Sequence, residues 1–290
     1  MAKVQKREKK KRKLISRLFW LCIIALIIWT VWGNLTIETN SVTITSKKLP
    51  QSFDGFTIAH VSDLHNTQFG DDNEKIISIL SDAKPDIIAI TGDIVDSNRT
   101  NVDVALNFAR QAAKIAPCYF VAGNQERFIS ADEYTRLKNG LTEIGVIVLE
   151  DSKATIERNG ETISIIGIEE FITQSSKEYY LSIDKDKLCE LNSDGDFSIL
   201  LSHRPDYFDD YVESGCDLVL TGHTHGGQFR LPYVGGLYVP SQGFLPEYDA
   251  GLFTQNGTDM IVSRGLGNSR FPFRFNNRPE VIIIELKAEK

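Results

Sequence analysis

The sequence predicts an α/β domain, with a mixed sheet or two packed sheets, behind a single N-terminal transmembrane helix. Nine short apolar runs rich in β-branched residues recur along the chain, and amphipathic helical stretches separate the first of them. One long apolar stretch follows a basic N-terminus. The composition, with 42% hydrophobic and 24% charged residues, excludes a disordered or collagen-like chain.

The formal net charge of -7 is distributed unevenly. Residues 1–17 hold nine lysines and arginines against one acid, Glu8, so the rest of the chain carries about -15. Nucleic-acid binding relies on Lys and Arg to neutralise phosphates, and so acidic a body is a poor candidate for it. We therefore expect no nucleic acid among the partners of this protein.

The segment 18–33 has the properties of a membrane anchor behind the basic tail 1–17. A helix needs roughly 20 apolar residues to cross the hydrocarbon core, and the stretch from Leu14 to Gly33 supplies about that number. The basic flank should stay cytoplasmic, which predicts a single-pass protein of the cell membrane whose body lies outside the cytoplasm. A cleaved signal peptide is the alternative, but no small-residue cleavage site follows the apolar stretch, which favours an uncleaved anchor.

The rest of the chain is one domain, residues 53–290, joined to the anchor by the Thr-rich stretch 34–52, which alternates like an edge strand. The apolar runs are four to six residues long and nearly unbroken, as in strands buried on both faces. They are Phe56–Val61, Ile87–Thr91, Tyr119–Ala122, Val146–Leu149, Ile163–Ile168, Phe197–Ser202, Leu218–Thr221, Met260–Ser263 and Val281–Leu286.

Two stretches with helical periodicity, Asp72–Lys84 and Val102–Lys114, each place apolar residues on one face. They predict β-α-β-α-β order over residues 56–122. The region 146–168 is predicted as a β meander, with a hairpin turn at Asn159-Gly160.

Polar, chemically active side chains follow five of the predicted strands. Because the carboxyl ends of strands in α/β sheets converge on one crevice, residues far apart in sequence should meet there. The strand-end segments are Asp63-Leu64-His65, Gly92-Asp93, Gly123-Asn124-Gln125-Glu126, Ser202-His203 and Gly222-His223-Thr224-His225. A lone histidine at any of these places is more often a core residue, but five such ends in one chain are not explained that way.

Together these ends offer two Asp, one Asn and four His, a set of oxygen and imidazole ligands without thiolate. Seven ligands are too many for one ion, and they suit two divalent metal ions that share a bridging carboxylate. Mn, Fe, Zn or Co is more plausible than Ca or Cu(I) for this set. Two ions about 3.5–4 Å apart generate a bridging hydroxide and clamp an in-line displacement at phosphorus.

At this point the sequence resembles the calcineurin-like metallophosphoesterase superfamily, whose pattern runs D-x-H, G-D-x-x-D, G-N-H-[DE], H and G-H-x-H. The resemblance covers residues 53–290, and the segments 220–230 and 263–268 resemble the membrane-anchored or exported bacterial branch of YkuE/YaeI-type phosphodiesterases. It implies a four-layer αββα sandwich. It also implies that one ion is bound by Asp63, His65 and His225, that the other is bound by Asn124, His203 and His223, and that Asp93 bridges them.

Gln125 departs from the pattern, because it stands where the superfamily usually has the histidine of G-N-H-[DE]. The resemblance implies that this position and Asn124 act in catalysis, the histidine by protonating the leaving oxygen or by stabilising charge on the phosphoryl group. Glutamine donates a hydrogen bond but no proton near pH 7. We therefore expect weak activity on alkyl monoesters and better activity on bonds with good leaving groups.

The sequence thus predicts a membrane-anchored hydrolase of phosphodiester or pyrophosphate bonds, with a phosphate-ester substrate that is lipid, lipid-linked or part of the envelope. The alternative is a catalytically weakened metal-binding envelope protein, because Gln125 replaces the family's histidine. Three arginines are candidates for phosphate contact, with surface salt bridges as the other explanation: Arg230, Arg264 and Arg270. The oligomeric state, the metal bound in the cell and the natural substrate are not specified by the sequence.

Overall fold

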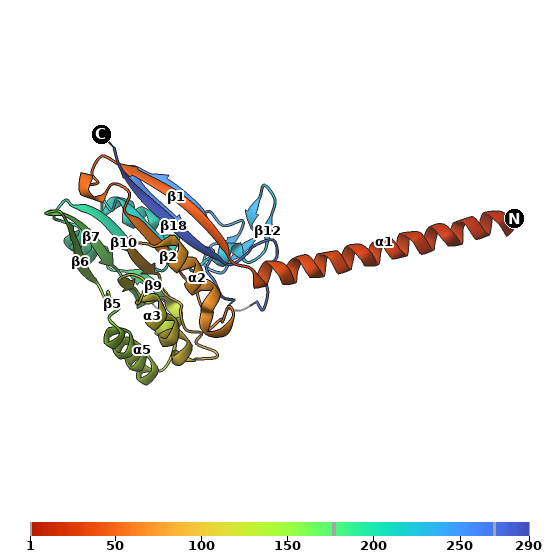
Figure 1. Cartoon of the computed structure of the whole chain (residues 1–290), viewed down its shortest axis with the longest axis horizontal. Helices are drawn as coiled ribbons and strands as arrows, with labels where there is room; N and C mark the ends of the chain where they lie inside the picture. Colours follow the sequence, from red (N-terminus) through yellow and green to blue (C-terminus); the bar gives the residue numbers. More distant parts are fainter. Residues whose placement is uncertain (1, 176–177, 269–270, 290) are drawn as a thin grey trace.

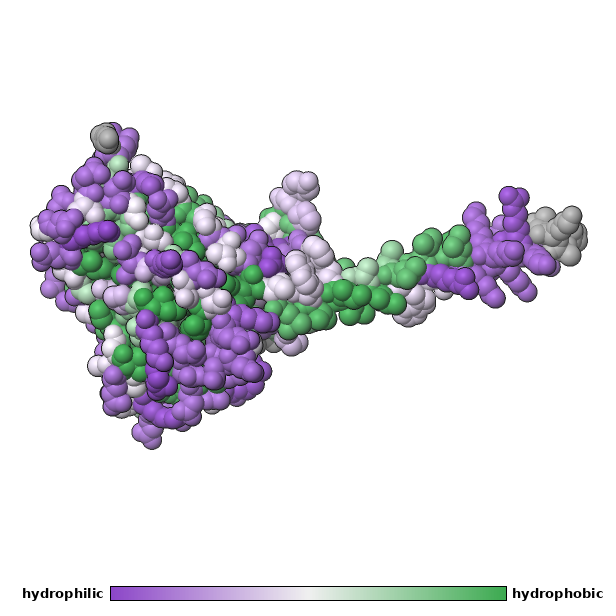
Figure 2. All heavy atoms as spheres, in the orientation of Figure 1, coloured by the Kyte–Doolittle hydropathy of each residue, from purple (hydrophilic) through white to green (hydrophobic). Residues whose placement is uncertain are grey.

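A computed structural model of the chain describes residues 2–175, 178–268 and 271–289, and shows one long helix projecting from a folded body (Figure 1). This helix, α1, is Ala2–Leu35 and contains the whole stretch 18–33. Its most apolar window is long and apolar enough to cross a membrane, and none of that window is buried. Figure 2 shows hydrophilic residues at the far end of α1 and hydrophobic residues along most of the part nearer the body.

The first sheet has six strands in the order β1-β18-β2-β3-β4-β5. β2 to β5 are parallel to one another, β18 is antiparallel to β2, and β1 pairs in parallel with β18 over nine residues. The edge strand β1 lies within the stretch 34–52. The strands are β1 (Glu38–Ser46), β2 (Thr57–Val61), β3 (Ile87–Ile90), β4 (Cys118–Phe120), β5 (Ile147–Val148) and β18 (Glu280–Ala288).

The second sheet also has six strands, in the order β16-β17-β11-β10-β7-β6. Its four central strands are parallel, and the two edge strands run antiparallel to their neighbours. The strands are β6 (Ser152–Arg158), β7 (Glu161–Gly167), β10 (Phe197–Leu201), β11 (Leu218–Thr221), β16 (Gly251–Gln255) and β17 (Thr258–Val262).

The body has four layers, because the two sheets pack face to face and helices cover their outer faces. Alternate side chains of β3 divide between two cores: Ile87 and Ala89 face the second sheet, while Ile88 and Ile90 face the helices. The helices over the first sheet are α2 (Glu74–Ala83), α3 (Val102–Ala112) and α5 (Ala131–Ile144). Those over the second are α6 (Lys185–Leu191) and α7 (Phe208–Glu213). The predicted α/β fold, with the αββα sandwich that the resemblance implied, is confirmed.

The region 146–168 is not a continuous meander, and this expectation was wrong. β5 joins the first sheet, whereas β6 and β7 form a hairpin of the second. The turn at Asn159-Gly160 is correctly predicted, with φ values of 55° and 82° that suit a two-residue hairpin loop. Periodicity did not reveal the crossing, because short buried strands have the same apolar pattern in either sheet.

The four strands β2 to β5 all have their carboxyl ends on one side of the first sheet, which we call the site edge. Since β18 is antiparallel to β2, this is also the edge at which β1 and β18 begin and α1 ends. The remaining short elements lie in the connections between these strands and helices, most of them near the site edge. They are α4 (Asn124–Phe128), β8 (Glu170–Ser175), β9 (Glu178–Ile183), β12 (Arg230–Leu231), β13 (Gly235–Gly236), β14 (Tyr238–Val239) and β15 (Gly243–Phe244), with 3₁₀ turns at Gln51–Phe53, Asp71–Asn73, Pro205–Tyr207 and His225–Gly227.

Candidate metal centre

Asp63, His65 and His225 form the first of two clusters of polar side chains at the site edge. Asp63 Oδ1 lies 3.4 Å from His225 Nε2 and 3.7 Å from His65 Nε2, and the two ring nitrogens are 3.1 Å apart. The side chains of Asp63 and His65 have no exposed surface, and that of His225 is 12% exposed. One carboxylate oxygen and two imidazole nitrogens therefore point at a common centre, as the ligands of a cation do.

Asp93, His203 and His223 form the second cluster. Asp93 Oδ2 lies 3.2 Å from His203 Nε2, and that nitrogen is 3.3 Å from His223 Nδ1. The same Asp93 oxygen is only 3.6 Å from His65 Nε2 of the first cluster. Asp93 therefore faces both clusters, which is the position that a bridging carboxylate requires.

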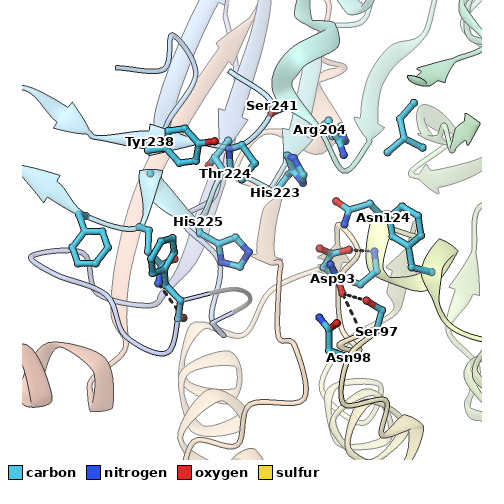
Figure 3. Close-up of a pocket in the computed structure, with 18 of the residues that line it drawn as sticks. Asp93, Ser97, Asn98, Asn124, Arg204, His223, Thr224, His225, Tyr238 and Ser241 are labelled. Carbon is cyan, nitrogen blue, oxygen red and sulfur yellow. Dashed lines mark hydrogen bonds between the residues drawn. The ribbon is translucent and has the colours of Figure 1, made fainter. Parts of the chain in front are cut away.

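Asn124 completes the second cluster from the N-terminus of α4. Figure 3 shows its amide beside Asp93 and across the cavity from His223. Its Oδ1 is buried and accepts no hydrogen bond from the residues that the structure describes. A buried amide oxygen without a donor is costly unless a cation meets it. The oxygen and imidazole ligands at this edge thus fit two divalent ions, and the structure brings all seven predicted ligands together.

The protonation of the four histidines is uneven. Burial lowers the pKa of His225 to about 3 and that of His223 well below its usual value. Burial acts on His203 in the same direction, but Asp93, Asp63 and Glu170 together outweigh it and raise the pKa of His203 to about 10. The pKa of His65 is likewise raised, because Asp63 and Asp93 outweigh its burial. In each cluster, therefore, the charges favour the protonated form of one histidine and burial favours the neutral form of the other, and a bound cation would compete with the proton.

The backbone at the clusters is held in an uncommon conformation. Five of the seven predicted ligands have φ between 47° and 69°: Asp63, His65, Asp93, His223 and His225. Such left-handed residues cost roughly 1–3 kcal/mol each and persist where the surroundings impose them, as at functional sites. Neighbouring glycines allow the close packing that results. A Cβ on Gly123 would lie 2.3 Å from Asp93 Oδ1, and one on Gly222 would lie 1.9 Å from Ser62 Oγ.

Glu126 holds the Asp93 loop in place, a role that the sequence analysis missed. Its buried carboxylate accepts hydrogen bonds from four backbone N–H groups, those of Gly123, Asp93, Ile94 and Val95, at 2.8–3.2 Å. Burial, with the nearby charge of Asp93, raises the pKa of Glu126 to about 7. The one sequence signal for this role was the position of Glu126, two residues after Asn124 at the end of a predicted strand.

Gln125 lies on the cavity wall with its amide held in one orientation. Its Oε1 accepts hydrogen bonds from the backbone N–H of Ser97 at 2.9 Å and from the Ser97 hydroxyl at 2.7 Å. A backbone N–H only donates, so the oxygen of the amide must face Ser97 and Nε2 must point elsewhere. Gln125 also donates from its own backbone N–H to Asp93 Oδ1 at 2.7 Å, which leaves Oδ2 for the clusters.

Two of the three arginines that the sequence singled out pair with carboxylates away from the two clusters. Arg230 pairs with Asp249, and Arg264 pairs with Glu280 and Glu38, so both are structural salt bridges. Arg270 lies outside the described residues.

Two other arginines, Arg274 and Arg204, lie at the site. Arg274 is buried, and its Nη2 lies 3.2 Å from His225 Nδ1. Arg204 follows His203, lines the cavity and bonds Glu170 through Nε. For Arg274 no sequence signal existed, whereas Arg204 is adjacent to a predicted ligand.

A cavity of about 990 Å³ opens over the second cluster. Asp93, Asn124, His223 and His225 reach it together with Arg204. The remaining wall is mainly apolar and aromatic: Phe128, Leu181, Phe229, Tyr238, Pro240, Phe244 and Phe271. A site with charged ligands on one side and an apolar wall on the other suits an amphiphilic substrate.

Comparisons with known proteins give one consistent result. The profile of the calcineurin-like phosphoesterase family matches residues 56–227. The chain is 31% identical to the uncharacterized metallophosphoesterase YkuE of Bacillus subtilis, over 87% of this chain and 86% of that one. It is 30% identical to the phosphodiesterase YaeI of Escherichia coli, over 80% and 82% of the two chains. The solved structure of the sulfate thiohydrolase SoxB from Thermus thermophilus has a similar fold, with a TM-score of 0.52 and 12% identity over 83% of this chain and 58% of that one.

Proposed function

The chain belongs to the calcineurin-like phosphoesterase family and is a hydrolase, and we propose that it is a membrane-anchored, two-metal phosphodiesterase. In this proposal it cleaves a phosphodiester or pyrophosphate bond of a lipid, a lipid-linked compound or another envelope component. The observation that carries the proposal is the pair of convergent clusters that share Asp93. One cluster alone would hold a single ion, whereas in-line cleavage at phosphorus profits from two.

Asp63, His65 and His225 would hold one ion, Asn124, His203 and His223 the other, and Asp93 both. Two divalent ions at this place supply Lewis acidity, which neutralises charge on the phosphoryl group and lowers the pKa of a water. His203 donates from Nδ1 to the Thr91 carbonyl at 2.7 Å, which orients Nε2 toward Asp93. Arg204 places a positive charge on the cavity wall, where it can hold a phosphate oxygen.

Gln125 determines which leaving groups are cleaved well in this proposal. Its Nε2 is a neutral donor that can hydrogen-bond an oxygen of the phosphoryl group, but it has no proton to give to the leaving oxygen. An alkoxide needs that proton, whereas a phosphate or a phenolate leaves without it. The substrate bond is therefore a pyrophosphate or a diester with an acidic alcohol component rather than an alkyl monoester.

Replacing Gln125→His is expected to raise the cleavage rate for a diester with an alkyl leaving group by about 10²-fold, the lower end of the usual gain from a general acid. The rate for a p-nitrophenolate leaving group should change little. Rates on the two substrates measure the effect, with Gln125→Ala as the control that supplies neither a donor nor a proton. Equal rates of the unaltered enzyme on both leaving groups, with no gain in the histidine variant, would count against the proposed role.

We also propose that α1 anchors the protein in the cell membrane, with the basic residues 2–17 in the cytoplasm and the body outside it. The support is the apolar length of the helix, the full exposure of its apolar window and the basic charge at one end. In this arrangement the site acts on compounds at or near the outer face of the membrane.

Removal of metal is expected to abolish diester hydrolysis, and reloading with Mn²⁺ or Zn²⁺ should restore it. The assay uses the full chain in detergent micelles, stripped with a chelator, with bis-p-nitrophenyl phosphate and p-nitrophenyl phosphate as substrates. Reloading with Ca²⁺ is the control, because this ligand set suits first-row ions better than Ca²⁺. Two bound ions without turnover on any phosphodiester would instead favour the alternative, a metal-binding envelope protein that has lost catalysis at Gln125.

A further inference from the structure

We propose that the body itself docks on the membrane that α1 enters, through an apolar rim around the mouth of the cavity. The rim consists of Tyr233, Val234, Phe244, Leu245, Phe271 and Phe273. This docking proposal rests on the proposed function only in that α1 is taken as a membrane anchor. It adds a second contact with the outer leaflet, and it assigns the cavity to substrates that remain in the bilayer.

The rim exposes large apolar and aromatic side chains to an unusual degree. Tyr233 is fully exposed, Phe244 is 82% exposed and Leu245 is 64% exposed. The other three have about half of their surface exposed. Clustered side chains of this kind mark a surface that is covered in use. Tyrosine and phenylalanine suit the membrane interface, where an apolar ring meets a polar layer.

Two of these side chains stand at strained backbone positions. Tyr233 has φ of 66° in the turn between β12 and β13, and Leu245 has φ of 55° directly after β15, in a conformation for which glycine or asparagine is the usual residue. The chain thus accepts backbone strain to present a bulky side chain at both positions. Neither residue packs in the core, so stability gives no reason for the choice.

The three segments of the rim form one continuous surface. The ring of Phe229 lies 5.8 Å from that of Phe271 and 5.5 Å from that of Phe273. The Leu237 N–H donates to the Phe229 carbonyl at 2.9 Å, and the Leu245 N–H donates to the Leu237 carbonyl at 3.0 Å. Both hairpins and the segment 271–273 are therefore joined through Phe229.

The rim lies at the end of the membrane helix. Asn34 Oδ1 accepts from the Arg274 N–H at 2.7 Å, and Asn34 Nδ2 donates to the Arg274 carbonyl at 2.8 Å. The Arg278 guanidinium stacks on Trp32, 4.9 Å from the ring centroid. The apolar stretch of α1 ends at Trp32, so no spacer separates the bilayer from the body. Figure 1 shows the β12 hairpin beside the point where α1 leaves the body.

The rim also borders the catalytic cavity, because Phe244 and Phe271 line it together with His223 and Asp93. A rim resting on the bilayer therefore brings the metal clusters beside the lipid headgroups. A lipid phosphodiester reaches such a site without leaving the membrane, its apolar part against the aromatic wall. With the leaving groups expected for Gln125, the substrate class that fits is a lipid-linked pyrophosphate or a lipid phosphodiester with an acidic alcohol component, rather than a soluble nucleotide.

A fluorescent label at the rim tests the docking. The full chain, with the two exposed cysteines removed (Cys22→Ser, Cys189→Ser), is labelled with a nitrobenzoxadiazole thiol reagent at Val234→Cys and reconstituted in phosphatidylcholine–phosphatidylglycerol nanodiscs. Brominated acyl chains should quench this label about twofold or more, as expected for a side chain below the headgroups. The matched control is Glu157→Cys, exposed near the hairpin turn at the opposite end of the second sheet. Equal, weak quenching at both positions overturns the proposal.

A double variant, Tyr233→Asn with Leu245→Asn, separates docking from folding. Asparagine tolerates the left-handed conformation, so the melting temperature should stay the same or rise, while the quenching at position 234 should fall to the level at position 157. Unchanged quenching in this variant overturns the role of the rim. Metal-dependent hydrolysis of bis-p-nitrophenyl phosphate is measured on the same nanodiscs. Hydrolysis without rim quenching contradicts the docking alone, whereas quenching without hydrolysis supports the docking and contradicts the proposed enzyme.

Discussion

Asp93→Asn is expected to lower metal-dependent diester hydrolysis by about 10³-fold or more, the largest loss among single substitutions at the site. Asp93 Oδ2 is the oxygen that lies within 3.6 Å of a ring nitrogen from each cluster. An amide oxygen carries no net charge, so the variant should hold the two ions far less tightly. The fold should survive, because an asparagine Oδ1 still accepts the Gln125 N–H.

Metal content per chain, measured by inductively coupled plasma mass spectrometry, and turnover on bis-p-nitrophenyl phosphate check this prediction together. The matched control is Asp96→Asn, three residues along the same loop. The Asp96 carboxylate accepts from the N–H groups of Asn98 and Arg99 and faces neither cluster, so its amide variant should remain active. An Asp93→Asn enzyme that retains two ions and most of its turnover would show that Asp93 does not bridge.

Glu126→Gln is expected to destabilise the protein by about 3–5 kcal/mol and to weaken metal binding by about 10–100-fold. Each oxygen of the Glu126 carboxylate accepts from two backbone N–H groups. In glutamine an NH₂ group replaces one of these oxygens, so two buried N–H groups would face a donor instead of an acceptor. The Asp93 loop would then move away from the clusters.

Urea unfolding monitored by circular dichroism and titration with Mn²⁺ measure the two effects of this substitution. Glu143→Gln is the matched control, because Glu143 is exposed on α5 and should leave both quantities unchanged. A glutamine variant at position 126 with unaltered stability would mean that the four N–H groups find other acceptors, such as water. A loss of stability with unaltered metal affinity would mean that Glu126 stabilises the fold but does not position the metal ligands.

The strand-end motifs predicted much of the site because the information in them is local. A glycine followed by a ligand, as in Gly92-Asp93 and Gly222-His223, marks a place where the chain turns sharply after a strand. Because the carboxyl ends of parallel strands lie on the same side of a sheet, these ligands are expected to meet there without any further sequence signal. The same local reasoning failed for the region 146–168, since periodicity does not say to which of two sheets a short strand belongs.

The role of Glu126 was missed for a different reason. Its sequence position is beside two predicted site residues, but what it does depends on four N–H groups that converge only when two strand ends lie together. The fixed amide of Gln125 likewise depends on Ser97, which belongs to another loop. A sequence gives the residue types available, and the fold decides which donors meet which acceptors.

The sequence by itself determined the two-sheet α/β fold, the seven candidate ligands and the family, because apolar periodicity and strand-end motifs act over a few residues. Only the tertiary structure decided that Arg274 stands against His225, that Asp93 faces both clusters, and that α1 ends beside the cavity. Those facts join residues as far apart as Asn34 and Arg274, whose contact follows from the parallel pairing of β1 with β18. Such contacts are set by how the strands assemble, which no local pattern records.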